Sequence, residues 1–353
     1  MVGNQEEHII FPKPDEDVTA PSRKQDHIEL AFKSQIAAAN NDTRFFYEPL
    51  LSAHASVNNI PTSNFGNKVL KAPLWVSSMT GGTQLARKIN HNLARACHDF
   101  GLGMGLGSCR QLLQEDTYLK DFDVRSIIGD DLPFFANLGI AQVEQLIATN
   151  CTHLIPELLD KLRVDGLIIH INPLQEWLQP EGDIFHVSPL ETIEIFIEKY
   201  PHINLIIKEV GQGMGYNSLK ALFQLPILAI DFAALGGTNF SQIELMRNQK
   251  SAQGAFHNLT FVGHTAIEMV QFCNQILTDL HPDEIKCKQV IISGGVGDFL
   301  DGFYLINKIN INAIYGQASG FLKHAKESYD ELHTYVADQI KGLSLANSFL
   351  RVK

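Results

Sequence analysis

Residues 205–223 read LIIKEVGQGMGYNSLKALF, and the pattern in this stretch is the basis for predicting the fold. It begins with a short apolar run, turns at a cluster of glycines, and continues with apolar residues at helical spacing. A buried parallel strand followed by an amphipathic helix has this order. The stretch therefore predicts one unit of strand and helix.

The same order recurs along the chain. We expect strands at residues 74–79, 102–107, 134–138, 167–172, 205–210, 228–233, 290–293 and 313–316. Helical patterns cover residues 85–100, 142–150, 189–199, 218–223, 265–280 and 328–349. Eight parallel strands that alternate with helices favour closure into one (β/α)₈ barrel, a TIM barrel, of the α/β class. An open doubly wound sheet is the alternative.

The domain boundaries follow from local composition. Residues 1–22 contain three prolines and several acidic residues, which predicts a flexible leader. Residues 23–353 are expected to form a single barrel domain. The connection at 234–263 is long and rich in glycine, and a loop of that length usually forms a lid or carries short elements of its own.

Composition limits the class of protein and its ligands. The chain has 353 residues, 45% of them apolar, so it can bury a large core. No apolar run approaches the roughly 18 residues of a membrane helix, and the five cysteines include no C-x-x-C pair. We expect a cytoplasmic protein. The formal net charge of -11 disfavours nucleic acid and anionic membranes as partners, so local cations, backbone N–H groups or a metal must hold any anionic ligand.

Glycines follow the last two predicted strands, where barrels of this class usually bind phosphate. Gly294-Gly295 comes after the seventh strand and Ala318-Ser319-Gly320 after the eighth. Glycine lets backbone N–H groups approach phosphate oxygens closely, especially where a helix begins. Each group could instead only form a tight turn, but their presence at both expected strand ends favours a phosphate site.

Charged residues at other strand ends suggest an anionic ligand. Lys208 ends an apolar strand, where its ammonium needs an anionic partner, either a ligand with delocalised charge or Glu209 in a structural pair. Glu176 is the kind of single carboxylate that magnesium uses beside a diphosphate, although it could be a solvated loop acid. The cations in Arg23-Lys24-Gln25-Asp26-His27 could converge on one phosphate or form an ordinary solvated surface.

Six strings in the same order resemble the type 2 isopentenyl-diphosphate isomerases. They are Arg23-Lys24-Gln25-Asp26-His27, Met79-Thr80-Gly81-Gly82, His170-Ile171-Asn172-Pro173-Leu174-Gln175-Glu176, Pro180-Glu181-Gly182-Asp183, Lys208-Glu209-Val210-Gly211-Gln212-Gly213-Met214 and Gly236-Gly237-Thr238-Asn239-Phe240. The resemblance runs from about Arg23 to Leu322. It implies an enzyme that interconverts isopentenyl and dimethylallyl diphosphate with reduced FMN and Mg²⁺, with NAD(P)H as the flavin reductant, in a homotetramer or homo-octamer.

The resemblance also implies a role for each matching residue. FMN would contact Ser78, Met79, Thr80, Gly81, Ser108, Asn137, Lys208 and Thr238, with its phosphate on Gly295, Val296, Gly297, Ala318 and Ser319. The substrate would contact Arg23, Lys24, His27, Ser108, Arg110, His170, Asn172 and Gln175. Glu176 would bind Mg²⁺. The catalytic group would comprise Gln175 beside the double bond, His170, and Lys208 beside the flavin.

Three residues depart from the family pattern. Cys109 stands where a polar residue is usual, Ala233 replaces a usual serine, and Gly297 replaces a usual basic residue. The loss of a cation at Gly297 should weaken FMN binding unless backbone donors compensate.

The implied chemistry is a proton added at one carbon and removed at another, which no side chain in this set is acidic enough to perform alone. Reduced FMN would carry the proton at N5. An FMN-dependent 2-hydroxy-acid oxidase or dehydrogenase on the same barrel is the main alternative, and a barrel that binds FMN or phosphate without catalysis is another.

Overall fold

The structure is a computed structural model that describes residues 20–54, 60–78, 83–247, 254 and 256–353. The chain divides into two units, Met1–Phe45 and Phe46–Lys353. In the first unit, helix α1 (Ala20–Leu30) is followed by a short 3₁₀ helix, η1 (Ala38–Asn40). Strand β1 (Phe45–Tyr47) spans the division. Most of the predicted leader lies outside the described residues, and the single-domain assignment of 23–353 stays a prediction.

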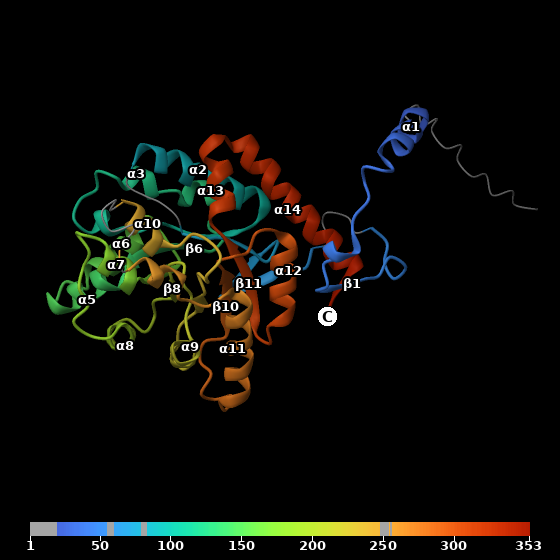
Figure 1. Cartoon of the computed structure of the whole chain (residues 1–353). Helices are drawn as coiled ribbons and strands as arrows, with labels where there is room; N and C mark the ends of the chain where they lie inside the picture. Colours follow the sequence, from blue (N-terminus) through green and yellow to red (C-terminus); the bar gives the residue numbers. More distant parts are fainter. Residues whose placement is uncertain (1–19, 55–59, 79–82, 248–253, 255) are drawn as a thin grey trace, which may run out of the picture. The chain divides into compact units, whose positions relative to one another are not determined.

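The second unit contains a closed barrel of eight strands in the order β10, β11, β4, β5, β6, β7, β8, β9 (Figure 1). The strands are β4 (Leu74–Val76), β5 (Gly103–Gly105), β6 (Phe134–Gly139), β7 (Gly166–Ile171), β8 (Leu205–Glu209), β9 (Ala229–Asp231), β10 (Gln289–Ser293) and β11 (Asn312–Gln317). Every neighbouring pair is parallel. The predicted barrel is confirmed, and the open sheet is wrong.

Helices connect the strands, and the six helical segments predicted from periodicity are among them. The helices are α2 (Gln84–Phe100), α3 (Leu119–Phe122), α4 (Arg125–Ile128), α5 (Ile140–Ala148), α6 (Leu154–Leu162), α7 (Pro173–Leu178), α8 (Pro189–Lys199), α9 (Tyr216–Phe223), α10 (Phe240–Arg247), α11 (Ala266–Asp279), α12 (Phe299–Lys308), α13 (Ser319–Glu327) and α14 (Tyr329–Phe349). Local signals fix several ends: Thr265 and Glu268 form a capping box at α11, and Gly101 ends α2 in the left-handed conformation.

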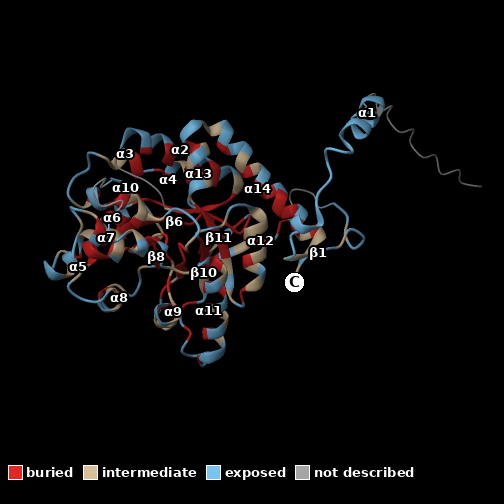
Figure 2. Cartoon of the chain, viewed as in Figure 1, coloured by how far each residue is buried: buried red, intermediate tan, exposed pale blue. Residues whose placement is uncertain are grey.

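A hairpin packs against the barrel core at the amino-terminal ends of the strands. Its strands are β2 (Ser63–Phe65) and β3 (Lys68–Leu70). The N–H of Gly66 donates to Gln289, the first residue of β10. Phe65 packs against Trp75 with ring centroids 5.1 Å apart, among buried aliphatic side chains of the strands. The strands of the barrel are mostly buried and are coloured red in Figure 2. The opposite end of the barrel, where the strands finish, is therefore the end available for a ligand.

The long connection predicted at 234–263 carries short elements of its own. Helix α10 occupies its first half, and the 3₁₀ helix η3 (His257–Phe261) lies near its end. Two other short elements are η2 (Arg110–Leu113) and β12 (Leu350–Val352). Among the described residues, no helix has the length and apolar character needed to cross a membrane.

Candidate functional site

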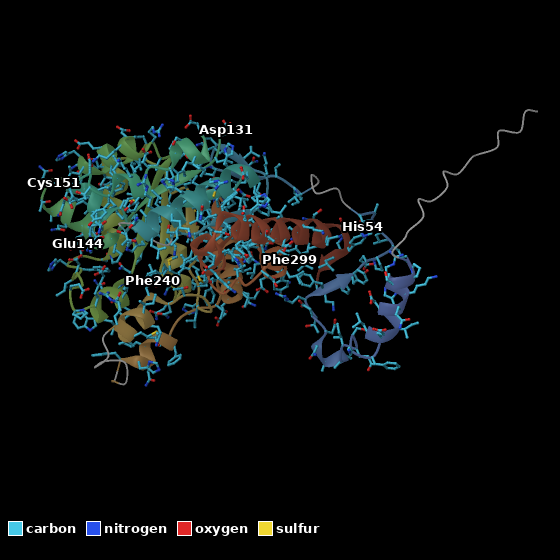
Figure 3. All side chains as sticks on the ribbon, turned by 90° about the horizontal axis from the view of Figure 1, so that it is seen from above. His54, Asp131, Glu144, Cys151, Phe240 and Phe299 are labelled. Carbon is cyan, nitrogen blue, oxygen red and sulfur yellow. The ribbon has the colours of Figure 1, made fainter. Side chains whose placement is uncertain are left out.

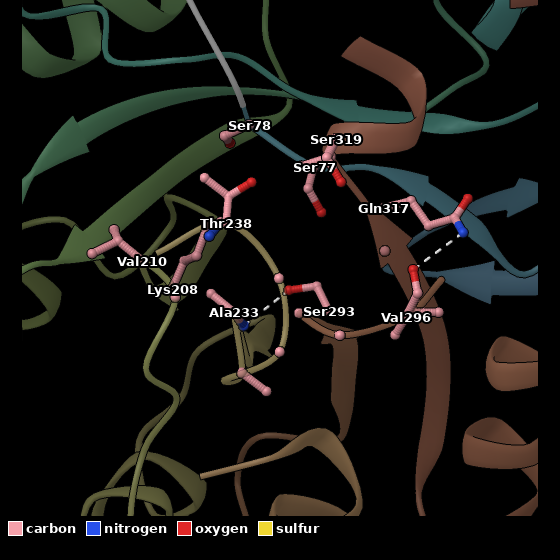
Figure 4. Close-up of a pocket in the computed structure, with 18 of the residues that line it drawn as sticks. Ser77, Ser78, Lys208, Val210, Ala233, Thr238, Ser293, Val296, Gln317 and Ser319 are labelled. Carbon is pink, nitrogen blue, oxygen red and sulfur yellow. Dashed lines mark hydrogen bonds between the residues drawn. The ribbon is translucent and has the colours of Figure 1, made fainter. Parts of the chain in front are cut away.

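The larger of two adjoining cavities lies at the carboxyl ends of strands β4, β8, β9, β10 and β11 (Figure 4). Its wall is formed by serine, glycine and alanine residues of the strand-to-helix turns, with Lys208 and Phe240. Of the residues predicted to bind FMN, it gathers Ser78, Lys208, Thr238, Gly295, Val296, Gly297, Ala318 and Ser319. Five separate turns therefore contribute to one hollow.

Glycines on two facing turns form a narrow cradle in this cavity. Gly294 and Gly295 have φ of 85° and 69°, values that residues with a side chain rarely adopt. A Cβ at Gly294 would lie 2.1 Å from the carbonyl oxygen of Ala234. A Cβ at Gly237 would lie 3.1 Å from the nitrogen of Gly295. The two turns can approach each other only because these residues lack side chains.

The amino terminus of α13 adds to the same wall. Ala318 and Ser319, where the helix begins, line the cavity. The first N–H groups of a helix have no partner within the helix, and the helix dipole favours an anion there. The cavity therefore combines a glycine cradle with a helix terminus, an arrangement that suits phosphate.

A second cavity adjoins the first and shares Ser78, Lys208, Val210 and Phe240 with it. Phe240, labelled in Figure 3, is the first residue of α10. The residues that line only the second cavity are Gly107, Ser108, Asn137, His170 and Gln175. Two ligands could thus lie side by side, with Lys208 accessible to both.

A chain of hydrogen bonds organises the second cavity. The amide nitrogen of Asn137 donates to Ser78 Oγ at 3.1 Å, and Asn137 Oδ1 lies 2.7 Å from Nδ1 of His170. Because that oxygen only accepts, Nδ1 carries the proton in this arrangement. Burial of the imidazole among the surrounding strands, with the charges of Lys208 and Arg110, lowers the pKa of His170 to about 3. His170 is therefore neutral near pH 7.

Lys208 is buried at 8% exposure and its Nζ donates to the carbonyl oxygen of Glu209 at 2.7 Å. The carboxylate of Glu209 is used elsewhere, since Oε2 accepts from the N–H groups of Gly211, Gln212 and Gly213 at 2.6, 2.6 and 2.9 Å. The hydrogen bonds of the described residues therefore do not join the two side chains, although the charge of Lys208 opposes the rise in the pKa of Glu209 that burial causes. The ammonium is directed to the cavities.

Three other predicted residues lie nearby without lining either cavity: Arg110, Asn172 and Glu176. The carboxylate of Glu176 accepts from the side chain of Asn172 and from the N–H of Asp183, both at 2.8 Å. Arg110 lies 3.7 Å from the carboxylate of Asp183. Within the described ranges, no group of three or more His, Cys, Asp or Glu residues could hold a metal ion. The assignment of Glu176 to Mg²⁺ remains a prediction.

The remaining predicted residues do not line either cavity among the described residues of the second unit. Arg23, Lys24 and His27 belong to α1 in the first unit. Met79, Thr80 and Gly81 lie outside the described residues.

Several residues of the site were not predicted from the sequence. Ser77 lines the larger cavity, and its hydroxyl oxygen has no hydrogen-bond partner among the described residues. Gln317 also lines it, and its amide donates to the carbonyl oxygen of Val296 at 3.3 Å. Glu244 accepts from the amide of Gln175 at 3.4 Å. Ser77 could have been found because it precedes Ser78 at the strand end, whereas Glu244 is 69 residues away from Gln175.

Comparisons with known proteins add the family. No family model matches the chain. It is 35% identical over 314 residues to the isopentenyl-diphosphate delta-isomerase of Rickettsia peacockii, covering 87% of this chain and 86% of that one. The enzyme of the same name from Rickettsia typhi is 34% identical over 325 residues, covering 90% and 89%.

Two solved structures share the fold. A mandelate oxidase mutant with a monooxide FMN adduct superposes with a TM-score of 0.53 at 10% identity, covering 88% of each chain. A mutant flavocytochrome b2 with pyruvate bound gives 0.56 at 14%, covering 86% of this chain and 72% of that one. These likenesses concern the barrel alone, whereas the Rickettsia enzymes match along the sequence. The chain belongs to the isopentenyl-diphosphate delta-isomerases, as a type 2 member.

Proposed function

We propose that this isomerase converts isopentenyl diphosphate to dimethylallyl diphosphate with reduced FMN in the larger cavity and the substrate in the smaller one. One observation carries the proposal: the two cavities adjoin and share Lys208, Ser78 and Phe240. A flavin and a small alkene must lie against each other for a proton to pass between them. Adjoining cavities with a common cation between them meet that requirement.

The residues of the larger cavity fit FMN. Its glycine cradle and the start of α13 offer backbone N–H groups to the phosphate, and Ser77 Oγ offers an unused hydrogen-bonding group. Lys208 supplies positive charge for the electron-rich ring. Bound and reduced, FMN supplies the proton donor and acceptor that the side chains of the site lack. NAD(P)H is proposed only as the reductant.

The smaller cavity and its surroundings fit a diphosphate held through magnesium. Glu176 already has its carboxylate oriented by Asn172 and the Asp183 N–H, which is how proteins hold a metal-binding carboxylate in place. One carboxylate, several waters and phosphate oxygens would complete an Mg²⁺ site. Arg110, His170 and Ser108 are proposed to take the remaining phosphate oxygens, with Arg23, Lys24 and His27 of α1.

The chain's own residues provide placement and exclude water. Val210 and Phe240 give both cavities an apolar wall against which the hydrocarbon part of the substrate can rest. The amide of Gln175, held by Glu244, is proposed to fix the double bond in one position. Such positioning contributes to rate because it removes translational freedom before the proton moves. We further propose a cytoplasmic homotetramer or homo-octamer.

The test is anaerobic incubation of the purified, FMN-loaded protein with isopentenyl diphosphate, Mg²⁺ and a reductant, followed by analysis for dimethylallyl diphosphate. We expect product only when FMN is reduced and Mg²⁺ is present. Equal turnover by the oxidised protein without reductant would refute the role of reduced FMN. Bleaching of the flavin by lactate or mandelate, without isomerisation, would favour the hydroxy-acid oxidase instead.

A further inference from the structure

Asp231 is a buried acidic residue to which the proposed reaction gives no task. It is the last residue of β9 and its exposed fraction is 0%. A carboxyl group removed from water lowers stability unless charges or hydrogen bonds compensate. Its neighbours on the adjoining strands therefore indicate why an acidic residue occupies this position.

Both adjoining strands contribute a residue of the cavity wall. On β8, Lys208 is paired in register with Asp231. On β10, the hydroxyl of Ser293 donates to Oδ1 of Asp231. Lys208 and Ser293 both line the larger cavity, as Figure 4 shows. Asp231 thus lies beside Lys208 in the sheet and is hydrogen-bonded to Ser293, but it does not line the cavity itself.

Ser293 also connects Asp231 to the backbone of the cavity wall. Its Oγ accepts from the N–H of Ala233 at 2.9 Å. Ala233 has φ of 41°, a left-handed conformation that is unfavourable for a residue with a Cβ. The bond from Ser293 helps to hold Ala233 in this conformation, and Asp231 in turn orients the hydroxyl of Ser293.

Lys208 supplies the positive charge that acts on Asp231 among the described residues. Its Oδ2 makes no hydrogen bond in the described part of the chain. Burial raises the pKa of Asp231, and the positive charge of Lys208 is the foremost influence acting against that rise. The carboxylate of Glu209 also lies within the field of Lys208, but three backbone N–H groups already bind it. Asp231, paired in register with Lys208 on the neighbouring strand, lacks such donors at Oδ2 and is the second acidic side chain that balances Lys208.

We propose that Asp231 is a positioning residue that acts on FMN through Lys208 and Ser293. Its negative charge limits the positive field that Lys208 exerts on the flavin, and its hydrogen bond to Ser293 fixes the wall at Ala233. The inference rests on the proposed function, because it requires FMN in the larger cavity. It separates two effects, one on the reduction potential and one on the affinity for oxidised FMN.

The experiment measures the two-electron midpoint potential of bound FMN by anaerobic titration and the Kd of oxidised FMN by flavin fluorescence. Asp231→Asn removes the charge and keeps the acceptor for Ser293. We expect it to favour reduced over oxidised FMN about tenfold, a shift of about 30 mV to higher potential. Lys208→Met should shift the potential in the opposite direction. Without Lys208 the buried carboxyl of Asp231 takes up a proton and is neutral, so Asp231→Asn combined with Lys208→Met should match Lys208→Met alone.

Ser293→Ala is the matched control, because it removes the hydrogen bond and keeps the charge of Asp231. It should weaken binding of oxidised and reduced FMN by the same factor and therefore leave the potential unchanged. An unchanged potential in Asp231→Asn would overturn the electrostatic half of the proposal, and unchanged affinity in Ser293→Ala would overturn the other half. A double variant with a higher potential than Lys208→Met would show that Asp231 acts on the flavin directly. Wild-type protein that binds no FMN would instead refute the proposed function.

Discussion

His170 meets the substrate in an unexpected protonation state. Its Nδ1 proton is directed at Asn137, so the neutral ring presents a lone pair at Nε2, which would repel a phosphate oxygen. The pKa of about 3 in the free protein must therefore rise when a diphosphate binds. Because the bound state then holds more protons than the free state, binding should strengthen as pH falls from neutral toward the free pKa.

Calorimetric titration of the substrate in two buffers with different ionisation enthalpies tests this coupling. We expect uptake of up to about one proton per diphosphate, and the uptake should disappear in His170→Gln. That variant is its own control for protonation of the diphosphate itself. Identical proton uptake in the variant and the wild type would contradict the role given to His170.

Gly297 is the position where the family's usual cation is missing. It is exposed on the wall of the larger cavity, and its N–H donates to Asp301 at 2.9 Å. This donor is therefore partly engaged by an acid, which does not compensate for the lost cation. We predict that Gly297→Arg lowers the Kd of FMN about fivefold, since an exposed charge pair contributes about 1 kcal/mol. Fluorescence titration should show the gain fading at high salt.

The turn after β10 is an element whose shape depends on one atom. A Cβ at Gly294 would both meet the backbone of Ala234 and sit at positive φ, whereas the nearest atom to a Cβ at Gly297 is a movable carboxylate oxygen at 3.2 Å. Gly294→Ala should therefore lower the free energy of unfolding by at least about 1–2 kcal/mol and abolish FMN binding. Gly297→Ala, three residues away, should leave both nearly unchanged. Urea unfolding with and without FMN measures the difference, and equal effects would refute it.

Beside the smaller cavity, helix α10 is bonded to Gln175 of α7 and to Glu181 of the loop that follows α7. Arg247 donates to Glu244 at 2.6 Å and to Glu181 at 2.8 Å, and Glu244 accepts from Gln175. Glu244 is buried and would be left without its cation if Arg247 were removed.

We predict that Arg247→Ala lowers kcat about fivefold, the equivalent of about 1 kcal/mol, with little change in FMN affinity. Steady-state kinetics measures kcat, and fluorescence titration measures FMN affinity. Glu181→Gln serves as the control because it removes only the outer partner of Arg247. A kcat in Glu181→Gln as low as in Arg247→Ala would place the effect in the loop instead of at Gln175.

In the whole molecule, the barrel could be predicted because its strands are buried on both faces, so each strand appears in the sequence as a short apolar run. Lys208 and the glycines of the phosphate cradle were conspicuous for the same reason, as polar or small residues ending such runs. Asp231 carries the same signal inside an apolar strand and could have been found. The hairpin at residues 63–70 could not, because its sequence is largely polar and its strands are stabilised by packing on the barrel.

Contacts between residues distant along the chain could not be predicted from the sequence. Nothing local shows that Glu209 turns away from Lys208, or that Glu244 meets Gln175, since these choices are made when the strand ends assemble. The strings that resemble the family supplied what periodicity could not, a set of residues with a shared role. The strings at 170–176, 208–214 and 236–240 lie at or just after the ends of β7, β8 and β9, and a closed barrel of parallel strands brings those ends to one site.

The net charge of -11 is a property of the whole chain that affects how the substrate binds. A doubly anionic or triply anionic substrate approaching an acidic protein is repelled at long range, so each local cation carries more of the affinity. Arg23 of α1 is predicted to supply one, and a charge-assisted contact contributes about 1.5–3 kcal/mol. Arg23→Ala should therefore raise KM for isopentenyl diphosphate by about tenfold to a hundredfold and leave the Kd of FMN unchanged. Lys33→Ala removes the same charge from the same unit and should change neither, so an equal rise in KM would reduce the role of Arg23 to general electrostatics.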